Sequence, residues 1–237
     1  LEFRRVLFRS LYHDNNNGNN EGFGNVVFVD HKNKNELHAG RFFYNEKDGY
    51  GYATKRAMLV DYSQKDTLWM HADSMKLYTY NINTDSVRRE VHAFRHVRSF
   101  RNDMQAVCDS LVATSIDSCM TMYHDPIAWN INRQILGEVI KVYMSDSTIK
   151  RAEVINQALS VEQVDDKHFN QISSKRMDAF FKDGNMRRAD AVGCGRCGSG
   201  PPGGLAVRAR HARDGCQRPA DGDLRGPLAR ALHRRPG

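Results

Sequence analysis

Residues 71–78 read HADSMKLY, and this stretch contains the pattern that decides the fold. A small residue precedes Asp73, and apolar residues follow it two and four positions later, at Met75 and Leu77. The same pattern recurs without gaps when the chain is aligned on four further anchor positions, Gly40, Asp109, Glu138 and Lys175. An apolar residue at every second position is typical of a β-strand with one buried face. A pattern that recurs over a few tens of residues predicts a serially extended sheet.

Turn-forming pairs close most copies of the pattern. Eight positions after the anchor stand Asp48-Gly49, Asp117-Ser118, Asp146-Ser147 and Asp183-Gly184, while Asp85-Ser86 arrives later in the second copy. Short turns of this kind join antiparallel strands, because a parallel return needs a long crossover. The register of the returning strands stays open. A two-residue loop places Arg151 opposite Val142, whereas a three-residue loop places Ala152 there and keeps the apolar face cleaner.

Two rows of apolar side chains follow from the alignment. The row two positions after the anchor is Phe42, Met75, Leu111, Ile140 and Met177, and the row four positions after it is Tyr44, Leu77, Ala113, Val142 and Ala179. With a two-residue period, the anchor and both rows are predicted to share one face. The position between the rows holds Lys76, Lys141 and Asp178, among others. The pattern therefore predicts an all-β, antiparallel sheet with one solvated face.

The two ends of the chain differ in composition from its middle. Residues 1–10 resemble a translated adapter remnant, so we expect residues 1–21 to be a non-native or flexible segment. From Gly193 onward the sequence is rich in Arg, Gly and Pro, and the repeat stops. We expect residues 193–237 to be a disordered or frame-shifted tail. The predicted domain is therefore residues 22–192.

Charge and cysteine content exclude several functions. The net charge of +7 resides at the two ends and leaves −1 for residues 11–192, so a nucleic-acid partner has no electrostatic basis there. No apolar run is long enough for a transmembrane helix. Cys108 and Cys119 fit small strand residues. The C-x-x-C pair Cys194 and Cys197 lacks a second pair of zinc ligands, so we expect neither a metal nor a cofactor.

The apolar rows admit two interpretations. They can form the closed core of a structural β-repeat module, filled by their own neighbours. Alternatively, they line a trough that takes a lipid chain, at a gain of roughly 0.8 kcal/mol for each buried methylene.

Five stretches, taken in order and spacing, carry a resemblance to a known family. They are GNVVFV (24–29), HADSMKLY (71–78), FRNDMQAVCDSL (100–111), YHDPIAW (123–129) and FNQISSKRMDAFFK (169–182). Over roughly residues 22–192 the chain resembles the OstA-like family, which includes LptA-type periplasmic lipopolysaccharide-transport proteins. The resemblance implies an open, twisted, antiparallel β-jellyroll built from repeated hairpins.

The family resemblance also implies a function without catalysis. The chain is expected in the periplasm, either free or associated with the outer membrane, where it contributes to outer-membrane biogenesis. It is expected to shelter the lipid A acyl chains of lipopolysaccharide and to relay them toward the outer membrane. Edge strands would pair with other Lpt-type modules by β-augmentation. The side chains expected to bind lipid are Phe42, Tyr44, Met75, Leu77, Leu111, Ile140, Val142 and Met177.

Three groups of polar residues support competing hypotheses. Asp73, Asp109 and Glu138 occupy matching positions and would suit a carbohydrate-active β-solenoid, or a polar rim. The histidines His71, His92, His96 and His124 would suit zinc only if three or more converge. The run Arg95, Arg98 and Arg101 would meet lipid phosphates or form a solvated face. No nucleophile elbow, P-loop or dinucleotide motif is present, so we expect no enzyme.

Overall fold

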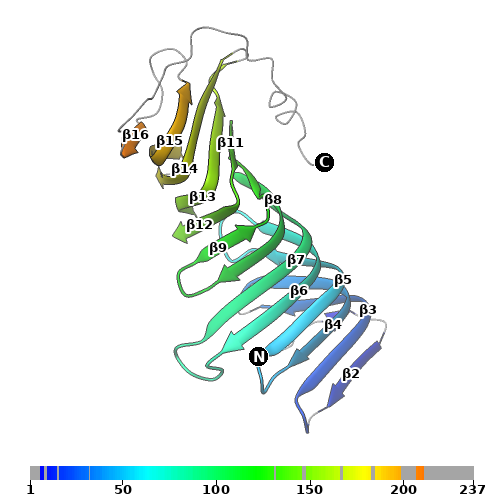
Figure 1. The fold of residues 1–237 in the computed structure, drawn as a ribbon. Coiled ribbons are helices and arrows are strands. Elements are labelled where there is room, and N and C mark those ends of the chain that lie inside the picture. Colours follow the sequence, from blue (N-terminus) through cyan, green and yellow to red (C-terminus); the bar gives the residue numbers. More distant parts are fainter. Residues whose placement is uncertain are drawn as a thin grey trace.

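The computed structural model describes residues 6–7, 10–14, 16–31, 33–130, 132–145, 148–165, 168–182, 185–198 and 207–210. Within these ranges every regular element is a β-strand, and all the strands belong to one sheet (Figure 1). The strands are β1 (Val6–Leu7), β2 (Ser10–Asp14), β3 (Asn19–Asp30), β4 (Asn35–Asn45), β5 (Tyr50–Asp61), β6 (Leu68–Tyr80), β7 (Arg88–Arg101), β8 (Met104–Thr114), β9 (Cys119–Tyr123), β10 (Ile127–Asn130), β11 (Arg133–Leu136), β12 (Val139–Ser145), β13 (Thr148–Gln163), β14 (Phe169–Lys182), β15 (Asn185–Gly198) and β16 (Val207–Arg210).

Strand pairing follows the order of the chain almost throughout. Strands β3 to β8 pair with their sequence neighbours, and β13 to β15 continue the same serial pattern. Every pair of described strands is antiparallel except β15 with β16. The predicted all-β, antiparallel class is therefore confirmed. The parallel stacking that defines a β-solenoid is not the architecture of the described strands.

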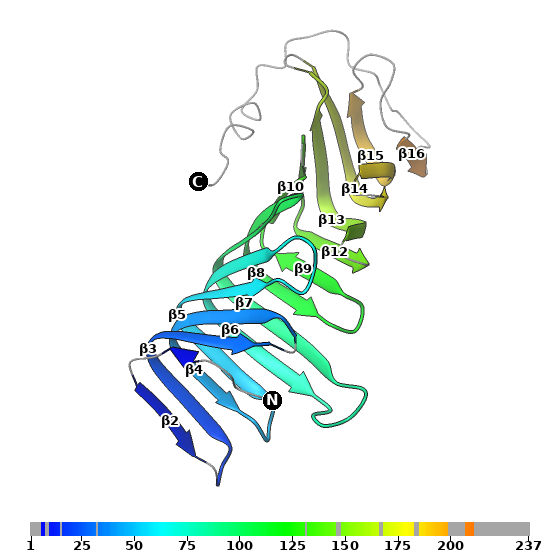
Figure 2. The same cartoon turned by 180° about the vertical axis from the view of Figure 1, so that it is seen from behind.

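A corner in each long strand divides the sheet into two layers (Figure 2). At the corner, two residues of one strand lie opposite a single residue of the next, which is the pattern of a β-bulge. The two-residue sides have positive φ, as at Lys55 and Arg56 or at Arg95 and His96. A bulge bends its strand, and repetition on successive strands folds the whole sheet along one line.

The first layer contains the predicted apolar rows, and the second layer lies across the corner. The first layer consists of β2, β9, β12 and residues 19–23, 41–45, 50–54, 74–80, 88–94, 110–114, 148–155, 176–182 and 185–192. The second layer consists of β1, β10, β11 and residues 26–30, 35–39, 57–61, 68–72, 97–101, 104–108, 158–163, 169–174 and 194–198.

The bulges explain why the sequence repeat aligns on its anchors. Asp73 is the single residue opposite Lys55 and Arg56, and Lys175 is the single residue opposite Asn156 and Gln157. The prediction that the anchor shares a face with the two apolar rows is wrong. Asp73 and Lys175 are exposed, whereas the residues one before and two after the anchor are buried. The bulge interrupts the two-residue period, so the anchor turns outward.

The register between β12 and β13 follows the second of the two predicted alternatives. Ala152 lies opposite Val142, and the register shifts by one residue between Tyr143 and Met144. Both Ala152 and Val142 are buried, so this register keeps apolar side chains together on the inner face. The predicted turn at Asp48-Gly49 joins β4 to β5, and the later turn at Asp85-Ser86 joins β6 to β7.

The sheet extends beyond the predicted domain boundaries. Strand β2 pairs with residues 19–23, and β15 crosses the boundary at Val192 and pairs with β14 as far as Gly198. The domain limits 22–192 and the nature of the two ends stay predictions. Most of the expected tail, residues 199–206 and 211–237, lies outside the described residues.

Candidate functional site

The eight side chains predicted to bind lipid all lie in the first layer and come from β4, β6, β8, β12 and β14. Met75, Leu111, Ile140 and Met177 are at most 1% exposed. Phe42, Tyr44 and Val142 are also buried, and Leu77 is half-buried against the same apolar cluster. The sheet therefore brings all eight to one continuous interior. Their role in lipid binding stays a prediction.

The opposite wall of this interior comes from the second layer. Its central row lies three positions before each anchor and comprises Leu37, Met70, Ala106, Ile135 and Ile172. All five side chains are at most 9% exposed. Sequence reasoning missed this wall, although the row is apolar in every copy. This row lies five positions before the nearest apolar row of the first layer. Such an odd spacing does not fit the two-residue period of a regular strand, and the bulge is what makes both rows face the interior.

The two walls contact each other directly in the interior. The rings of Phe28 in the second layer and Phe42 in the first are stacked, with centroids 5.4 Å apart. Eight of the nine methionines in the sequence belong to this apolar cluster or pack against it. Methionine is unbranched and polarizable, so its side chain adapts to different neighbours. The interior is thus apolar on both walls and rich in side chains that can repack.

The two layers are joined differently on their two long sides. At the corner the same strands continue from one layer into the other. The turns between strands lie at the opposite side, which is here called the open edge. Each backbone hydrogen bond of the described turns joins two segments of the same layer. The Nη1 atom of Arg101 lies 3.7 Å from the sulfur of Met144 across this edge. Side-chain contacts, rather than backbone ladders, therefore hold the open edge together.

Two arginines point inward near the open edge of the second layer. Arg101 is 2% exposed and donates from Nε and Nη2 to Asp103 at 2.5 and 2.8 Å. Arg133 is also buried, forms an ion pair with Glu162, and contacts the sulfur of Met186 in the first layer. Burial of a guanidinium requires a paired carboxylate, so these pairs neutralise the charge at the rim of the apolar interior.

The run Arg95, Arg98 and Arg101 does not form one surface. Arg95 has positive φ at the corner bulge, and Arg98 is exposed on the outer face of the second layer. Arg101 points into the interior. Neither the predicted phosphate-binding run nor the predicted solvated face therefore includes all three, because Arg98 and Arg101 lie three positions apart on a regular part of β7 and face opposite sides of the sheet.

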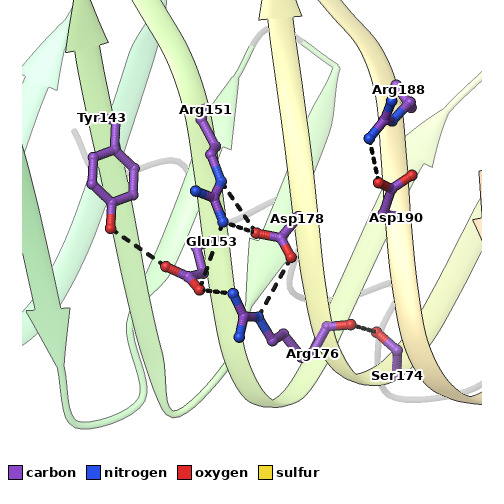
Figure 3. Close-up of polar contacts among 8 residues, drawn as sticks. All are labelled: Tyr143, Arg151, Glu153, Ser174, Arg176, Asp178, Arg188 and Asp190. Atoms are coloured by element: carbon purple, nitrogen blue, oxygen red, sulfur yellow. Dashed lines mark hydrogen bonds and ion pairs between the residues drawn. The ribbon is translucent and has the colours of Figure 1, made fainter. Parts of the chain in front are cut away.

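A ladder of ion pairs covers the outer face of the first layer on β12 to β15 (Figure 3). Glu153 and Asp178 lie directly opposite each other, as do Asp178 and Asp190. Adjacent carboxylates repel one another, and three arginines offset this repulsion. Arg151 donates to Asp178 at 3.2 Å through Nε, and Arg176 bridges Glu153 and Asp178.

The ion-pair ladder offers no free acid and base. The phenol of Tyr143 donates to Glu153 at 3.4 Å, and Arg188 lies 2.5 Å from Asp190. The hydrogen bond to Asp178 is the main cause that raises the pKa of Arg151. Glycoside hydrolysis needs one protonated and one ionised carboxyl group. Carboxylates that are all held by guanidinium groups favour a structural role for this ladder.

The predicted carboxylate row lies along the corner. The carboxylate of Asp73 lies 3.0 Å from Nδ1 of His96 and accepts a hydrogen bond when that nitrogen carries the proton. Glu138 accepts hydrogen bonds from the side-chain amides of Asn156 and Gln157, at 2.9 and 2.8 Å. These partners belong to the neighbouring bulges, so two of the three predicted acids brace the corner. Asp109 is exposed at its own corner position.

The four predicted histidines do not gather in one place. His92 pairs with Glu90 on the outer face of the first layer, whereas His96 pairs with Asp73 at the corner. His124 contacts Ser110 and also lies at a bulge. Within the described part of the chain, no group of three or more histidine, cysteine, aspartate or glutamate residues is arranged to hold a metal ion.

The two cysteines of the predicted domain are not joined in a disulfide. Burial, with a smaller contribution from Asp109, raises the pKa of Cys108 to about 12, and burial also raises the pKa of Cys119. Both side chains occupy strand positions, as predicted for small strand residues.

We predict that native Cys108 reacts with iodoacetamide at pH 8 at least 100-fold more slowly than the same residue in urea, because the thiolate is the reactive form. Its raised pKa also stabilises the fold below pH 9. That stabilisation is lost as the pH rises through about 12. Mass spectrometry of tryptic peptides measures the rate of Cys108 alkylation in the native protein and in urea. Equal rates in native and unfolded protein would contradict the burial of this thiol.

Comparisons with known proteins give one structural likeness. No protein-family profile matches the chain, and no curated protein matches its sequence. Among solved structures, the fold is similar to "LptH, the LptA homologous periplasmic component of the conserved lipopolysaccharide transport device from Pseudomonas aeruginosa". The TM-score is 0.37 at 14% identity, over 46% of this chain and 73% of that chain. A likeness this loose transfers no property of that protein. The described residues contain no helix long and apolar enough to span a membrane.

Proposed function

We propose that this protein binds the acyl chains of lipopolysaccharide between its two layers and relays them across the periplasm toward the outer membrane. The observation that carries the proposal is an apolar interior with two walls that runs along the sheet and, among the described residues, has no backbone ladder at one long side. The resemblance of five sequence stretches to the OstA-like family supplies the identity of the lipid. A relay of this kind needs binding and release, and no catalytic group.

Binding in this interior requires the layers to exchange one set of apolar neighbours for another. A guest chain separates pairs such as Phe28 and Phe42 and packs its own methylenes against both walls. Each buried methylene gains roughly 0.8 kcal/mol, which offsets the packing energy that the two layers give up when they separate. Methionine-rich walls lower the cost of repacking because their side chains adopt many shapes at similar energy.

The relay also requires contact with other modules. Strands β1 and β2 lie beyond β3 at one end of the sheet, and β15 and β16 lie at the other. We propose that edge strands at these two ends pair with similar β-modules, which would extend the apolar interior from one protein to the next. Unpaired edge strands are otherwise sites of aggregation, so a partner also protects them.

Opening of the edge between the layers is the expected structural response to lipid. Spin labels placed at Asn102 and Ser145 flank the contact of Arg101 with Met144 across the open edge. Before labelling, Cys194, Cys197 and Cys216 are replaced by serine, while the half-buried Cys108 and the buried Cys119 remain. We predict that lipopolysaccharide increases the distance between the labels by several ångströms, measured by pulsed electron resonance.

A second label pair provides the control for this measurement. Labels at Asp73 and Asp109 lie along the corner, where continuous strands join the layers, and their distance should stay constant. If lipopolysaccharide binds but the distance between the labels at the open edge stays the same, entry of lipid between the layers is contradicted. An equal change at both pairs would indicate general unfolding and would also contradict the proposal.

A further inference from the structure

The outer face of the second layer carries a depression that the proposed function does not use. Its volume is about 530 Å³, and strands β5, β6, β7 and β8 contribute its lining. This volume lies within the range of roughly 300–1,000 Å³ that is typical of small-molecule sites. The depression faces away from the apolar interior, since its exposed side chains alternate with the buried residues of the second layer.

Two large aromatic side chains lie side by side in this depression. Trp69 on β6 and Phe100 on β7 are directly opposite in register. They are 45% and 47% exposed, and the register of β6 and β7 makes them neighbours on one surface. Met58 adds a further apolar group to the lining. An exposed aromatic pair in a concave surface is typical of a binding site rather than of a scattered surface residue.

The same depression carries positive charge. Arg56 lies at the corner and Arg98 on β7, and both are exposed. Among the described residues, no carboxylate forms an ion pair with either guanidinium, although Asp73 also lines the depression. That carboxylate is instead held by His96 at 3.0 Å. Two arginines beside an aromatic surface therefore favour an anionic ligand that also has a ring.

We propose that this depression binds a phosphorylated sugar. The ring of the sugar would lie on Trp69 and Phe100, and its phosphate would accept hydrogen bonds from Arg56 and Arg98. Guanidinium groups suit phosphate because their planar donors bind its oxygens in pairs. The side chains of His71 and Gln105, which also line the depression, offer hydrogen bonds to hydroxyl groups. The choice of a sugar over a nucleobase rests on the proposed function in glycolipid transport.

The test uses the fluorescence of Trp69 in the full chain. The sequence holds two tryptophans, so Trp129→Phe leaves Trp69 as the sole reporter. We expect N-acetylglucosamine 1-phosphate to change this signal with saturation, and N-acetylglucosamine to bind at least about tenfold more weakly, because it lacks the phosphate. Vesicles of phosphatidylcholine, with and without lipid A, distinguish a glycolipid headgroup from a free sugar phosphate as the source of the same chemistry.

Substitutions locate the binding on this surface. Arg98→Ala should weaken binding at least about tenfold. Arg88→Ala, which removes an exposed guanidinium near Tyr80 on the first layer, should leave binding unchanged. Absence of binding to both the sugar phosphate and the lipid A vesicles would overturn the site, as would equal effects of the two substitutions. Adenosine monophosphate binding as tightly as the sugar phosphate would overturn the assignment to a sugar.

This test is independent of the test of lipid entry. A sugar phosphate that binds while the distance across the open edge stays constant would retain the site and reject transport between the layers. The reverse result would reject the site and retain the transport function.

Discussion

Replacement of Asp103 by asparagine is expected to lower the free energy of unfolding by about 3 kcal/mol. Asp103 receives two hydrogen bonds from Arg101, whose side chain is only 2% exposed. Without the carboxylate, the guanidinium stays in an apolar setting with no opposite charge. The loss lies at the low end for a broken buried pair because Asp103 itself retains contact with water. Urea denaturation measures the change.

Two further variants separate this effect from a general loss of surface charge. Asp73→Asn removes a carboxylate from an exposed pair with His96 and should cost less than about 0.5 kcal/mol. Combining Asp103→Asn with Arg101→Met should recover most of the loss, since methionine leaves no unpaired charge in the interior. Equal losses for Asp103→Asn and Asp73→Asn would show that Arg101 is not confined to the interior.

Replacement of Gly49 by alanine is expected to cost about 3 kcal/mol. Gly49 ends the turn between β4 and β5, has φ of +66°, and accepts a hydrogen bond from Thr79 at 2.7 Å. A Cβ atom there would meet the carbonyl oxygen of Thr79 at a separation that real Cβ atoms essentially never show. Since the obstacle is backbone, the turn would have to move away from β6.

Gly18 provides the matched control for this turn. It has φ of +72°, but the three atoms nearest to a Cβ atom there would all belong to Lys47, with its Cγ atom closest at 3.2 Å. Gly18→Ala should therefore cost about 1 kcal/mol, the value for left-handed backbone alone. Equal costs for the two substitutions, measured by urea denaturation, would contradict the close approach of the turn to β6.

The sequence pattern predicted the sheet because its rows of apolar residues are regular. Met75, Leu111 and Ile140 recur at fixed distances from their anchors, and all three are buried on one layer. The corner could not be predicted, because most of its positive-φ residues are not glycine. Lys55 and Arg56 have no side-chain property that favours a left-handed backbone. Their conformation is imposed by the pairing of neighbouring strands.

The second wall and the outer depression depended on this corner. Met70 and Met75 both point inward although they are five positions apart, an odd spacing that a strict two-residue period forbids. Trp69 and Phe100 are far apart in the sequence, and only the register of β6 and β7 brings them together. A sequence pattern predicts which residues share a face of one strand. It does not predict which residues of different strands become neighbours, because that depends on the register of the sheet.

Cross-linking from within the interior tests the central claim most directly. Photo-reactive amino acids at Leu111 and Ile140 in the first layer and at Met70 in the second face the interior, whereas Lys76 faces solvent. With lipopolysaccharide present, we predict that the three interior positions capture the lipid and that Lys76 does not. Failure of all three interior positions, or equal capture at Lys76, would contradict binding of acyl chains between the layers.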